Sequence, residues 1–277
     1  MILSAVLSVA IVEPLFANEG PAPAPGAMVA NPCPPALPVP GALQDALEGM
    51  LNPNAKSVNF DQLFSNPNIQ AFLKAQRERA QSDWANLCRY REANLALATR
   101  PVVVFIGDSI TENWVKGDPS LFSDRVVGRG IGGQTSPQIM LRFFQDVINL
   151  HPQVVHIMVG TNDIAGNSGA TSEKNFENNI RAMVQLAQAN HIKVALASIP
   201  PALSFPWNSA LKPAPTIMHL NAWLRSYAHG AHVKYLDYYT VLTDPDGGLL
   251  PGLSNDGVHP NREGYAVMKK TALTGIH

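Results

Sequence analysis

The chain has 277 residues, which is enough for one large domain or two small ones with a substantial buried core. A net charge of −1 gives no basic surface for nucleic acids or anionic membranes, so we expect neither as a partner. Apolar residues make up 46% of the chain and charged residues 15%, a composition typical of a folded globular protein.

The N-terminus begins with an apolar run over residues 2–12, which has the length of a signal-peptide core and is too short to span a bilayer. No Lys or Arg precedes it, and Leu15-Phe16-Ala17 is a possible cleavage site. We therefore expect a signal peptide over residues 1–17, export to the periplasm or the exterior, and no stable membrane insertion.

Residues 18–41 are expected to form a Pro/Ala-rich linker, because 21–40 contain eight prolines and suit an extended, semi-rigid chain. The two cysteines, Cys33 and Cys88, lie in this linker and in a later helical stretch. In an exported protein they could form a disulfide, and in a cytosolic one they would be reduced. We take the disulfide as a hypothesis.

Residues 42–98 are predicted to form a helical N-terminal extension. Helical periodicity is weak over 42–64 and strong over 68–98. We expect one or two amphipathic helices that pack on the following domain. Their apolar face would include Ile69, Phe72, Leu73, Trp84, Leu87, Cys88 and Leu95.

From residue 99 to 277 the pattern alternates between strands and helices. Residues 102–106 are an unbroken apolar run, which suits a strand buried on both faces of a parallel sheet. Further strands are predicted over 124–128, 154–159, 192–199 and 232–236, and helices over 110–116, 136–149, 171–190, 216–229 and 261–273. Ser136-Pro137 is the expected cap and first turn of its helix. The sequence thus predicts a three-layer α/β/α domain with a parallel sheet of order 2-1-3-4-5.

Gly107-Asp108-Ser109 follows the first strand, at the sheet edge where α/β proteins place their chemistry. A serine needs a base and a group that orients that base to become a nucleophile. Asp256 and His259 lie three residues apart in a Gly- and Pro-containing loop that can reach back to Ser109. We expect these three residues to be catalytic, although Asp256 and His259 alone would suit an ordinary surface turn.

Two more strand ends offer donors for an oxyanion. The second strand is followed by a glycine-rich stretch that ends at Gly133, and the third by Gly160-Thr161-Asn162-Asp163. The expected oxyanion hole combines the amides of Ser109 and Gly133 with the side chain of Asn162.

Other interpretations of these residues are weaker. Gly128-x-Gly130-x-x-Gly133 matches a dinucleotide fingerprint, but it follows the second strand instead of the first. Residue 111 is Thr, so the G-x-S-x-G elbow of α/β-hydrolases is absent. We expect no metal and no cofactor: the pair His229 and His232 suits a surface, and His156 a hydrogen-bonded core position. Trp114 and Trp207 are candidate walls of a substrate pocket, although ordinary packing explains each equally well.

Four ordered blocks in residues 101–275 resemble the SGNH (GDSL) hydrolases: Gly107-Asp108-Ser109, the Gly133 turn, Gly160-Thr161-Asn162-Asp163 and Asp256-Gly257-Val258-His259-Pro260. The resemblance implies a flavodoxin-like fold, with Ser109 as nucleophile, His259 as base and Asp256 as its orienter. It also implies an oxyanion hole of Ser109, Gly133 and Asn162. Many members carry Asn where this chain has Gly128, which could loosen the second block. Residues 129–135 and 160–167 are similar to the branch that contains platelet-activating-factor acetylhydrolase subunits, and bacterial carbohydrate O-acetylesterases are also close to that branch.

We therefore expect a metal-free serine esterase that hydrolyses short-chain esters, above all acetyl esters of carbohydrates, through an acyl-enzyme. Its partner would be a small-molecule or glycan ester substrate. A lysophospholipase, thioesterase or arylesterase of the same family is the alternative. A glycan-binding module without activity is the alternative of another class. The sequence does not indicate the oligomeric state.

Overall fold

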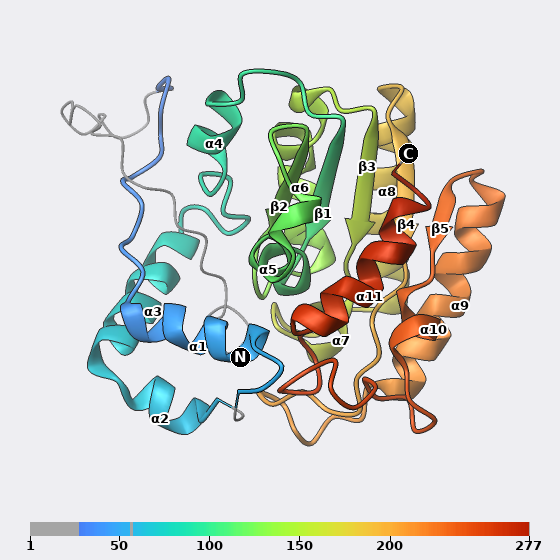
Figure 1. Cartoon of the computed structure of the whole chain (residues 1–277). Coiled ribbons are helices and arrows are strands. Elements are labelled where there is room, and N and C mark those ends of the chain that lie inside the picture. Colours follow the sequence, from blue (N-terminus) through green and yellow to red (C-terminus); the bar gives the residue numbers. More distant parts are fainter. Residues whose placement is uncertain (1–27, 56–57, 277) are drawn as a thin grey trace.

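The computed structural model describes residues 28–55 and 58–276, so the predicted signal peptide lies outside the described residues. Within them, one parallel sheet has the strand order β2-β1-β3-β4-β5 (Figure 1). Its strands are β1 Val103–Gly107, β2 Val126–Gly130, β3 Val154–Met158, β4 Lys193–Ala197 and β5 Lys234–Leu236. The predicted α/β class and strand order are confirmed.

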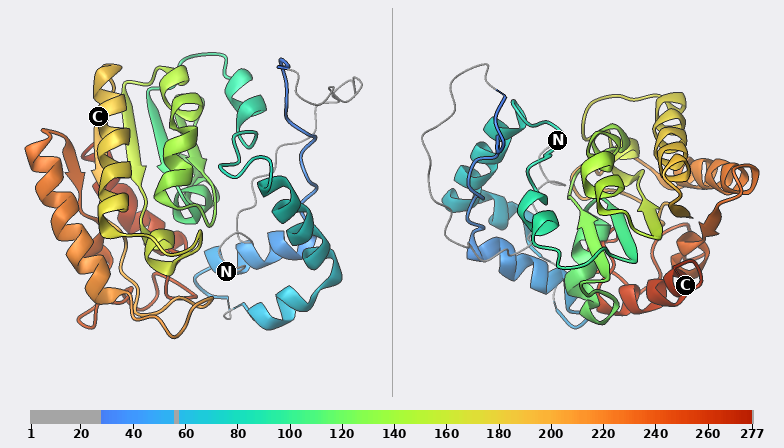
Figure 2. Two further views of the ribbon diagram at one scale, coloured as in Figure 1. Left: turned by 180° about the vertical axis from the view of Figure 1, so that it is seen from behind. Right: turned by 90° about the horizontal axis from the view of Figure 1, so that it is seen from above.

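Helices cover both faces of the sheet, which gives three layers (Figures 1 and 2). One face carries α6 Ser136–Asp146, α8 Glu173–Ala189 and α9 Ala214–Gly230, and the other carries α5 Ser109–Gly117, α10 Tyr238–Leu242 and α11 Arg262–Leu273. The short helices η1 Pro119–Leu121, η2 Ile148–Leu150 and α7 Thr161–Ala165 lie in the connections. Sequence periodicity missed α7 and α10, because five residues are too few to show a helical repeat.

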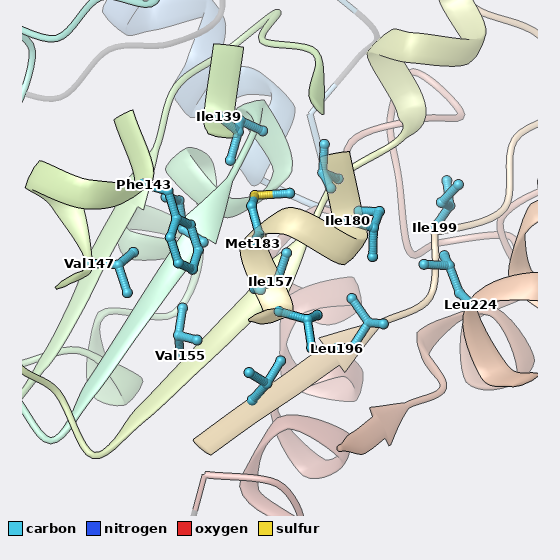
Figure 3. Close-up of a cluster of buried hydrophobic side chains, with 14 of the residues drawn as sticks. Ile139, Phe143, Val147, Val155, Ile157, Ile180, Met183, Leu196, Ile199 and Leu224 are labelled. Atoms are coloured by element: carbon cyan, nitrogen blue, oxygen red, sulfur yellow. The ribbon is translucent and has the colours of Figure 1, made fainter. Parts of the chain in front are cut away.

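The apolar strands are buried on both sides, as the unbroken hydrophobic runs indicate. Side chains of β1 alternate: Val104 and Ile106 pack under α6 and α8, whereas Val103 and Phe105 face α5 and α11. Figure 3 shows the first of these two cores, where Phe143 and Met183 fill the space between helices and strands. Each such side chain contributes roughly 1.5–3 kcal/mol when it is fully buried.

An aromatic cluster fills the second core. Phe105 stacks on His156 at 4.4 Å between ring centroids, and Trp114 stacks on Tyr265 at 5.5 Å. The Nε2 atom of His156 lies 2.8 Å from the hydroxyl of Tyr238. His156 is therefore a hydrogen-bonded core residue, as predicted, and burial lowers its pKa to about 3.

The N-terminal extension contains α1 Gly41–Leu51, α2 Phe60–Ser65, α3 Pro67–Ala80 and α4 Arg91–Leu95. It flanks the β2 side of the sheet (Figure 1), and its buried apolar side chains join the second core: Leu43, Leu47, Leu51, Ile69, Phe72 and Leu73. The prediction of a helical face through Trp84, Leu87 and Leu95 is wrong. Residues 81–90 form turns, and these three side chains are 46%, 41% and 66% exposed.

Two local boundaries differ from the prediction. Strand β2 begins at Val126, because a turn with a hydrogen bond from the Ser123 amide to the Val126 carbonyl precedes it. Helix α6 is capped by Thr135 in a capping box with Gln138, and Ser136 is its first residue. The Ser136 hydroxyl donates instead to Asp163 at 2.5 Å, which explains why it does not serve as the cap.

A disulfide joins Cys33 to Cys88, as hypothesised. It ties the extended stretch before α1 to the turns that follow α3, across 55 positions of sequence. A cross-link over a loop of this length restricts mainly the unfolded chain.

Replacing Cys33 and Cys88 together by Ser should lower the free energy of unfolding by about 2–4 kcal/mol, because the loop-closure entropy is then lost on folding. Urea denaturation of the variant and the wild type measures this difference. Thiol titration of the denatured wild type is the check on the bond itself: two thiols should appear only after reduction. Equal thiol counts before and after reduction would contradict the disulfide.

Candidate active site

Ser109 is the first residue of α5, directly after β1. Asp108 caps this helix, since its carboxylate accepts a hydrogen bond from the Ile110 amide at 3.0 Å. Gly107 permits the tight passage from strand to helix: a Cβ there would lie 2.2 Å from the Thr111 hydroxyl and 2.4 Å from the Met158 carbonyl. The Ser109 amide thus lies at the positive end of a helix.

The three residues predicted to meet at this edge are in hydrogen-bond contact. The Ser109 hydroxyl lies 2.9 Å from Nε2 of His259, and Nδ1 of His259 lies 2.7 Å from a carboxylate oxygen of Asp256. The other oxygen of Asp256 accepts from the amides of Val258 and His259 at 2.9 and 2.8 Å. Gly257, with φ of +78°, completes this turn. The turn fixes the imidazole between the carboxylate and the serine.

Charge makes this imidazole a good proton acceptor. Burial by itself would lower the pKa of His259, but the charge of Asp256, its hydrogen bond and the nearby Asp108 raise it above the ordinary value. Burial would raise the pKa of Asp256, yet His259 and the two amides outweigh it and hold the pKa low. The pair therefore favours an ionised carboxylate beside an imidazole that readily takes a proton.

Gly133 lies in the turn after β2 with φ of +77°. Its amide donates to no acceptor among the residues that the structure describes, so it is available to a ligand. Gly130, at the end of β2, lets the chain approach α5, because a Cβ there would lie 2.1 Å from the Glu112 amide nitrogen. The second block thus brings a free N–H group close to the start of α5.

Asn162, the second residue of α7, is 1% exposed. Its Nδ2 atom already donates to the Gln134 carbonyl at 3.0 Å and to Asp108 at 3.2 Å. Asn167 donates to its Oδ1 atom at 2.5 Å, which fixes the orientation of the amide. Unlike the Gly133 amide, Asn162 would have to share or exchange one of these bonds in order to donate to an oxyanion.

Two buried carboxylates support these elements, and the sequence motifs contained both without assigning them a role. Burial raises the pKa of Asp108 and of Asp163 to about 6 each. Asp163 accepts from the amide and the hydroxyl of Ser136, which joins the start of α6 to α7. Asp108 accepts from the side-chain amide of Asn162, which joins the start of α5 to α7. Each acid thus links two of the elements that follow the strand ends.

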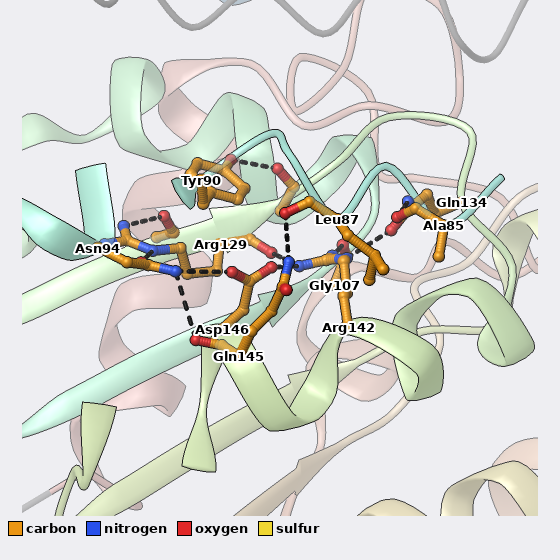
Figure 4. Close-up of polar contacts among 12 residues, drawn as sticks. Ala85, Leu87, Tyr90, Asn94, Gly107, Arg129, Gln134, Arg142, Gln145 and Asp146 are labelled. Atoms are coloured by element: carbon orange, nitrogen blue, oxygen red, sulfur yellow. Dashed lines mark hydrogen bonds and ion pairs between the residues drawn. The ribbon is translucent and has the colours of Figure 1, made fainter. Parts of the chain in front are cut away.

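A buried arginine forms hydrogen bonds with the backbone at the carboxyl ends of β1 and β2. Arg142 of α6 is fully buried and donates to the carbonyls of Gly107 and Arg129 at 2.8 and 2.7 Å (Figure 4). It also bonds Gln134 at 2.6 Å and pairs with Asp146 at 3.1 Å. No sequence pattern indicates this role, because a charged residue on an amphipathic helix normally faces solvent.

The two tryptophans have different positions. Trp114 is fully buried among Phe105, Tyr238 and Tyr265, so its interpretation as a pocket wall is wrong. Its side chain points from α5 toward the sheet, where packing excludes any substrate. Trp207 is partly buried, lies 6.0 Å from the His259 ring and donates to Asn167 at 3.2 Å. It remains a candidate wall.

The remaining motifs have structural explanations. Gly128 and Gly130 belong to β2 itself, so the glycine pattern is no phosphate-binding loop. Gly128 makes room for Val115, whose Cγ2 would lie 2.4 Å from a Cβ at this position. His229 and His232 are both exposed. Across residues 28–55 and 58–276 no three His, Cys, Asp or Glu side chains form a group that could hold a metal ion.

Comparisons with known proteins agree with this geometry. The model of the GDSL-like lipase/acylhydrolase family matches residues 105–267. A candidate acylhydrolase structure from Bacteroides fragilis is 47% identical, with 70% of this chain and 97% of that chain covered and a TM-score of 0.67. A GDSL-like lipase from Bacteroides thetaiotaomicron is 45% identical over 69% of this chain and 97% of its own, with a TM-score of 0.66.

Two further relatives are more distant. The acetyl xylan esterase AlAXEase is 26% identical, with 63% of this chain and 99% of that chain covered and a TM-score of 0.52. The uncharacterized lipoprotein YqeF of Bacillus subtilis is 33% identical over 79 residues, which are 27% of this chain. That match spans 32% of the length of YqeF.

The pKa of His259 in solution should lie above roughly 6.5, the reference value for histidine. The protonated ring is stabilised by Asp256, so the charged form should persist to higher pH than in a free histidine. Replacing Asp256 by Asn should lower the pKa, because burial is then less opposed. NMR titration of the ring nitrogens in both proteins measures this. A wild-type value at or below the reference value would contradict the assigned contact.

Proposed function

The chain belongs to the GDSL-like lipase/acylhydrolase family, and on that premise we propose that it is a metal-free serine esterase that removes short acyl groups, above all acetyl, from carbohydrates. The observation that carries the proposal is the continuous hydrogen-bond chain from Ser109 through His259 to Asp256. A binding module without activity would not require a buried serine to contact an imidazole whose pKa a carboxylate raises.

In the first half of the proposed reaction, the Ser109 oxygen attacks the ester carbonyl carbon while Nε2 of His259 takes the hydroxyl proton. Asp256 stabilises the imidazolium that forms. The negative charge on the former carbonyl oxygen is accepted by the amides of Ser109 and Gly133, with Asn162 as a third donor once it shares an N–H group. Collapse of this intermediate breaks the bond to the alcohol, and His259 returns its proton to the leaving oxygen.

In the second half, water attacks the acyl group on Ser109 and gives a proton to His259. The same donors hold the second oxyanion. The bond between the acyl carbon and the serine oxygen then breaks, and the serine recovers its proton from His259. The products are a carboxylic acid and the regenerated enzyme, and no cofactor is required.

The preference for acetylated carbohydrate is supported by the likeness to AlAXEase, an acetyl xylan esterase. Trp207 is the side chain best placed to contact substrate, because its ring lies beside His259 and packs on Phe205 at 5.2 Å. A flat indole can limit the space for an acyl chain or stack on a sugar ring.

Export is part of the proposal. The apolar N-terminal run and the likeness to the lipoprotein YqeF both support it, and the disulfide suits an oxidising compartment. No helix in the described residues combines the length and the apolar character needed to cross a membrane.

Replacing Ser109 by Ala should reduce hydrolysis of p-nitrophenyl acetate by roughly 10⁴–10⁶-fold, because the nucleophile is removed. Ser120→Ala is a matched control, since Ser120 is exposed and its hydroxyl forms hydrogen bonds with Asp118 and Lys269. Equal rates in the wild type and Ser109→Ala would refute the proposed nucleophile. A screen of acetylated polysaccharides with the same two proteins then identifies the acceptor.

Acyl-chain length separates the deacetylase from a lysophospholipase or other long-chain esterase. The wild type should hydrolyse acetyl esters with a higher kcat/KM than octanoyl esters. Trp207→Ala should raise the octanoyl-to-acetyl ratio by about tenfold, since the wall of the pocket is removed. Trp223→Ala is the control, because Trp223 packs on Phe176, a different part of the fold. A wild type that prefers octanoyl esters would favour the long-chain alternative.

A further inference from the structure

A short segment of the N-terminal extension contacts the turn that presents the Gly133 amide. The bracing segment, residues 83–94, precedes the sheet in sequence but lies against β2 and the start of α6 (Figure 4). We propose that it positions the oxyanion turn, with Arg89 and Glu112 as the positioning residues. This inference rests on the proposed esterase function.

Glu112 connects the nucleophile helix to the turn. It lies one helical turn after Ser109, is 5% exposed, and accepts a hydrogen bond from the Gly132 amide at 2.7 Å. Its second oxygen accepts from Arg89 at 2.8 Å. Because a carboxylate binds an N–H group more strongly than a neutral acceptor does, Glu112 fixes the Ile131–Gly132 peptide, one residue before the Gly133 amide.

Arg89 is the ion-pair partner of Glu112. A buried carboxylate that lacks an oppositely charged partner destabilises the fold, so the position of Glu112 beneath the turn requires a cation beside it. Arg89 is the partner that the structure provides, and its own side chain is 21% exposed. The cation that pairs with Glu112 therefore lies outside the matched family region, residues 105–267.

The bracing segment also holds the turn on both sides of Gly133. The Tyr90 hydroxyl donates to the Gly130 carbonyl, and the Ala85 carbonyl accepts from Gln134 at 2.7 Å. The backbone carbonyl of Gln134 in turn accepts a hydrogen bond from the side-chain amide of Asn162. Two of the three expected oxyanion donors are thus linked to this one segment.

Specific polar bonds hold the segment in addition to the burial of Ala85 and Tyr90. Trp84 and Leu87 are 46% and 41% exposed, so they contribute less to apolar packing than core residues do. Asp83 accepts from the amides of Leu87 and Cys88 at 2.7 and 3.0 Å, and the disulfide ties Cys88 to Cys33. Removing a polar contact should therefore change the position of the turn without emptying a core.

The test compares Glu112→Gln, Arg89→Ala and Arg89→Lys with the wild type, and Arg91→Ala is the matched control. Arg91 is two residues from Arg89, but its ion pair is with the exposed Glu92. The readouts are kcat and KM for p-nitrophenyl acetate and the inhibition constant of a trifluoromethyl ketone. The ketone forms a tetrahedral adduct that requires the oxyanion donors, and its affinity does not depend on the fraction of folded enzyme.

Glu112→Gln and Arg89→Ala should each lower kcat by about 10²-fold, with KM changed less than about threefold, and weaken the ketone by a similar factor. Arg89→Lys should recover part of both losses, and Arg91→Ala should match the wild type. If Glu112→Gln does not fold, the result for Arg89→Ala tests the proposal instead. Arg89 is partly exposed, so its replacement disturbs the fold less. Wild-type ketone affinity in Arg89→Ala would overturn this proposal alone, whereas a wild type without Ser109-dependent esterase activity would overturn the proposed function as well.

Discussion

The site depends on the close approach of α5 to the ends of three parallel strands. Gly107 pairs with Gly130 on one side and with Met158 on the other, so these three strands end at the same level. Side chains at Gly107 and Gly130 would collide with α5 or with the neighbouring backbone, and glycine alone permits the contact. Because the strands are parallel, each is followed by a turn at this same edge. Ser109, the Gly133 turn and Asn162 consequently come together, although more than fifty positions separate the first from the last in sequence.

Burial strengthens the electrostatic interactions between the charged groups near Ser109. Three buried acids each have a basic partner: Asp256 has the imidazole of His259, Glu112 has Arg89, and Asp146 has Arg142. A buried charge that loses its partner destabilises the protein strongly, so such pairs hold their elements in one arrangement. The field of these groups is also weakly screened, which is why Asp256 can raise the pKa of a histidine that burial would otherwise lower.

The N-terminal extension contacts the site from two directions. The bracing segment reaches the oxyanion turn, and α1 reaches the loop that carries Asp256 and His259. Asn255, next to Asp256, donates to the carbonyls of Gly49 and Asn52 at 2.9 and 2.8 Å at the end of α1. Arg262 pairs with Glu48 of the same helix. The extension therefore contributes contacts to both loops around Ser109 in addition to apolar side chains of the second core.

The sequence by itself determined the features that local pattern records: buried strands as apolar runs, the order of strands and helices, the Gly-Asp-Ser and Asp-x-x-His motifs, and the pair of cysteines. These motifs identified Ser109, Asp256 and His259, which do meet in the structure. Only the tertiary structure decided which buried polar side chains satisfy one another, because that depends on distances between segments far apart in the chain. Trp114 and Trp207 looked equivalent in sequence, yet one is core and the other lies beside His259. Nothing in the sequence pattern distinguishes Glu112 and Arg142 from ordinary surface charges on helices, and their neighbours after folding make them buried supports of the strand ends.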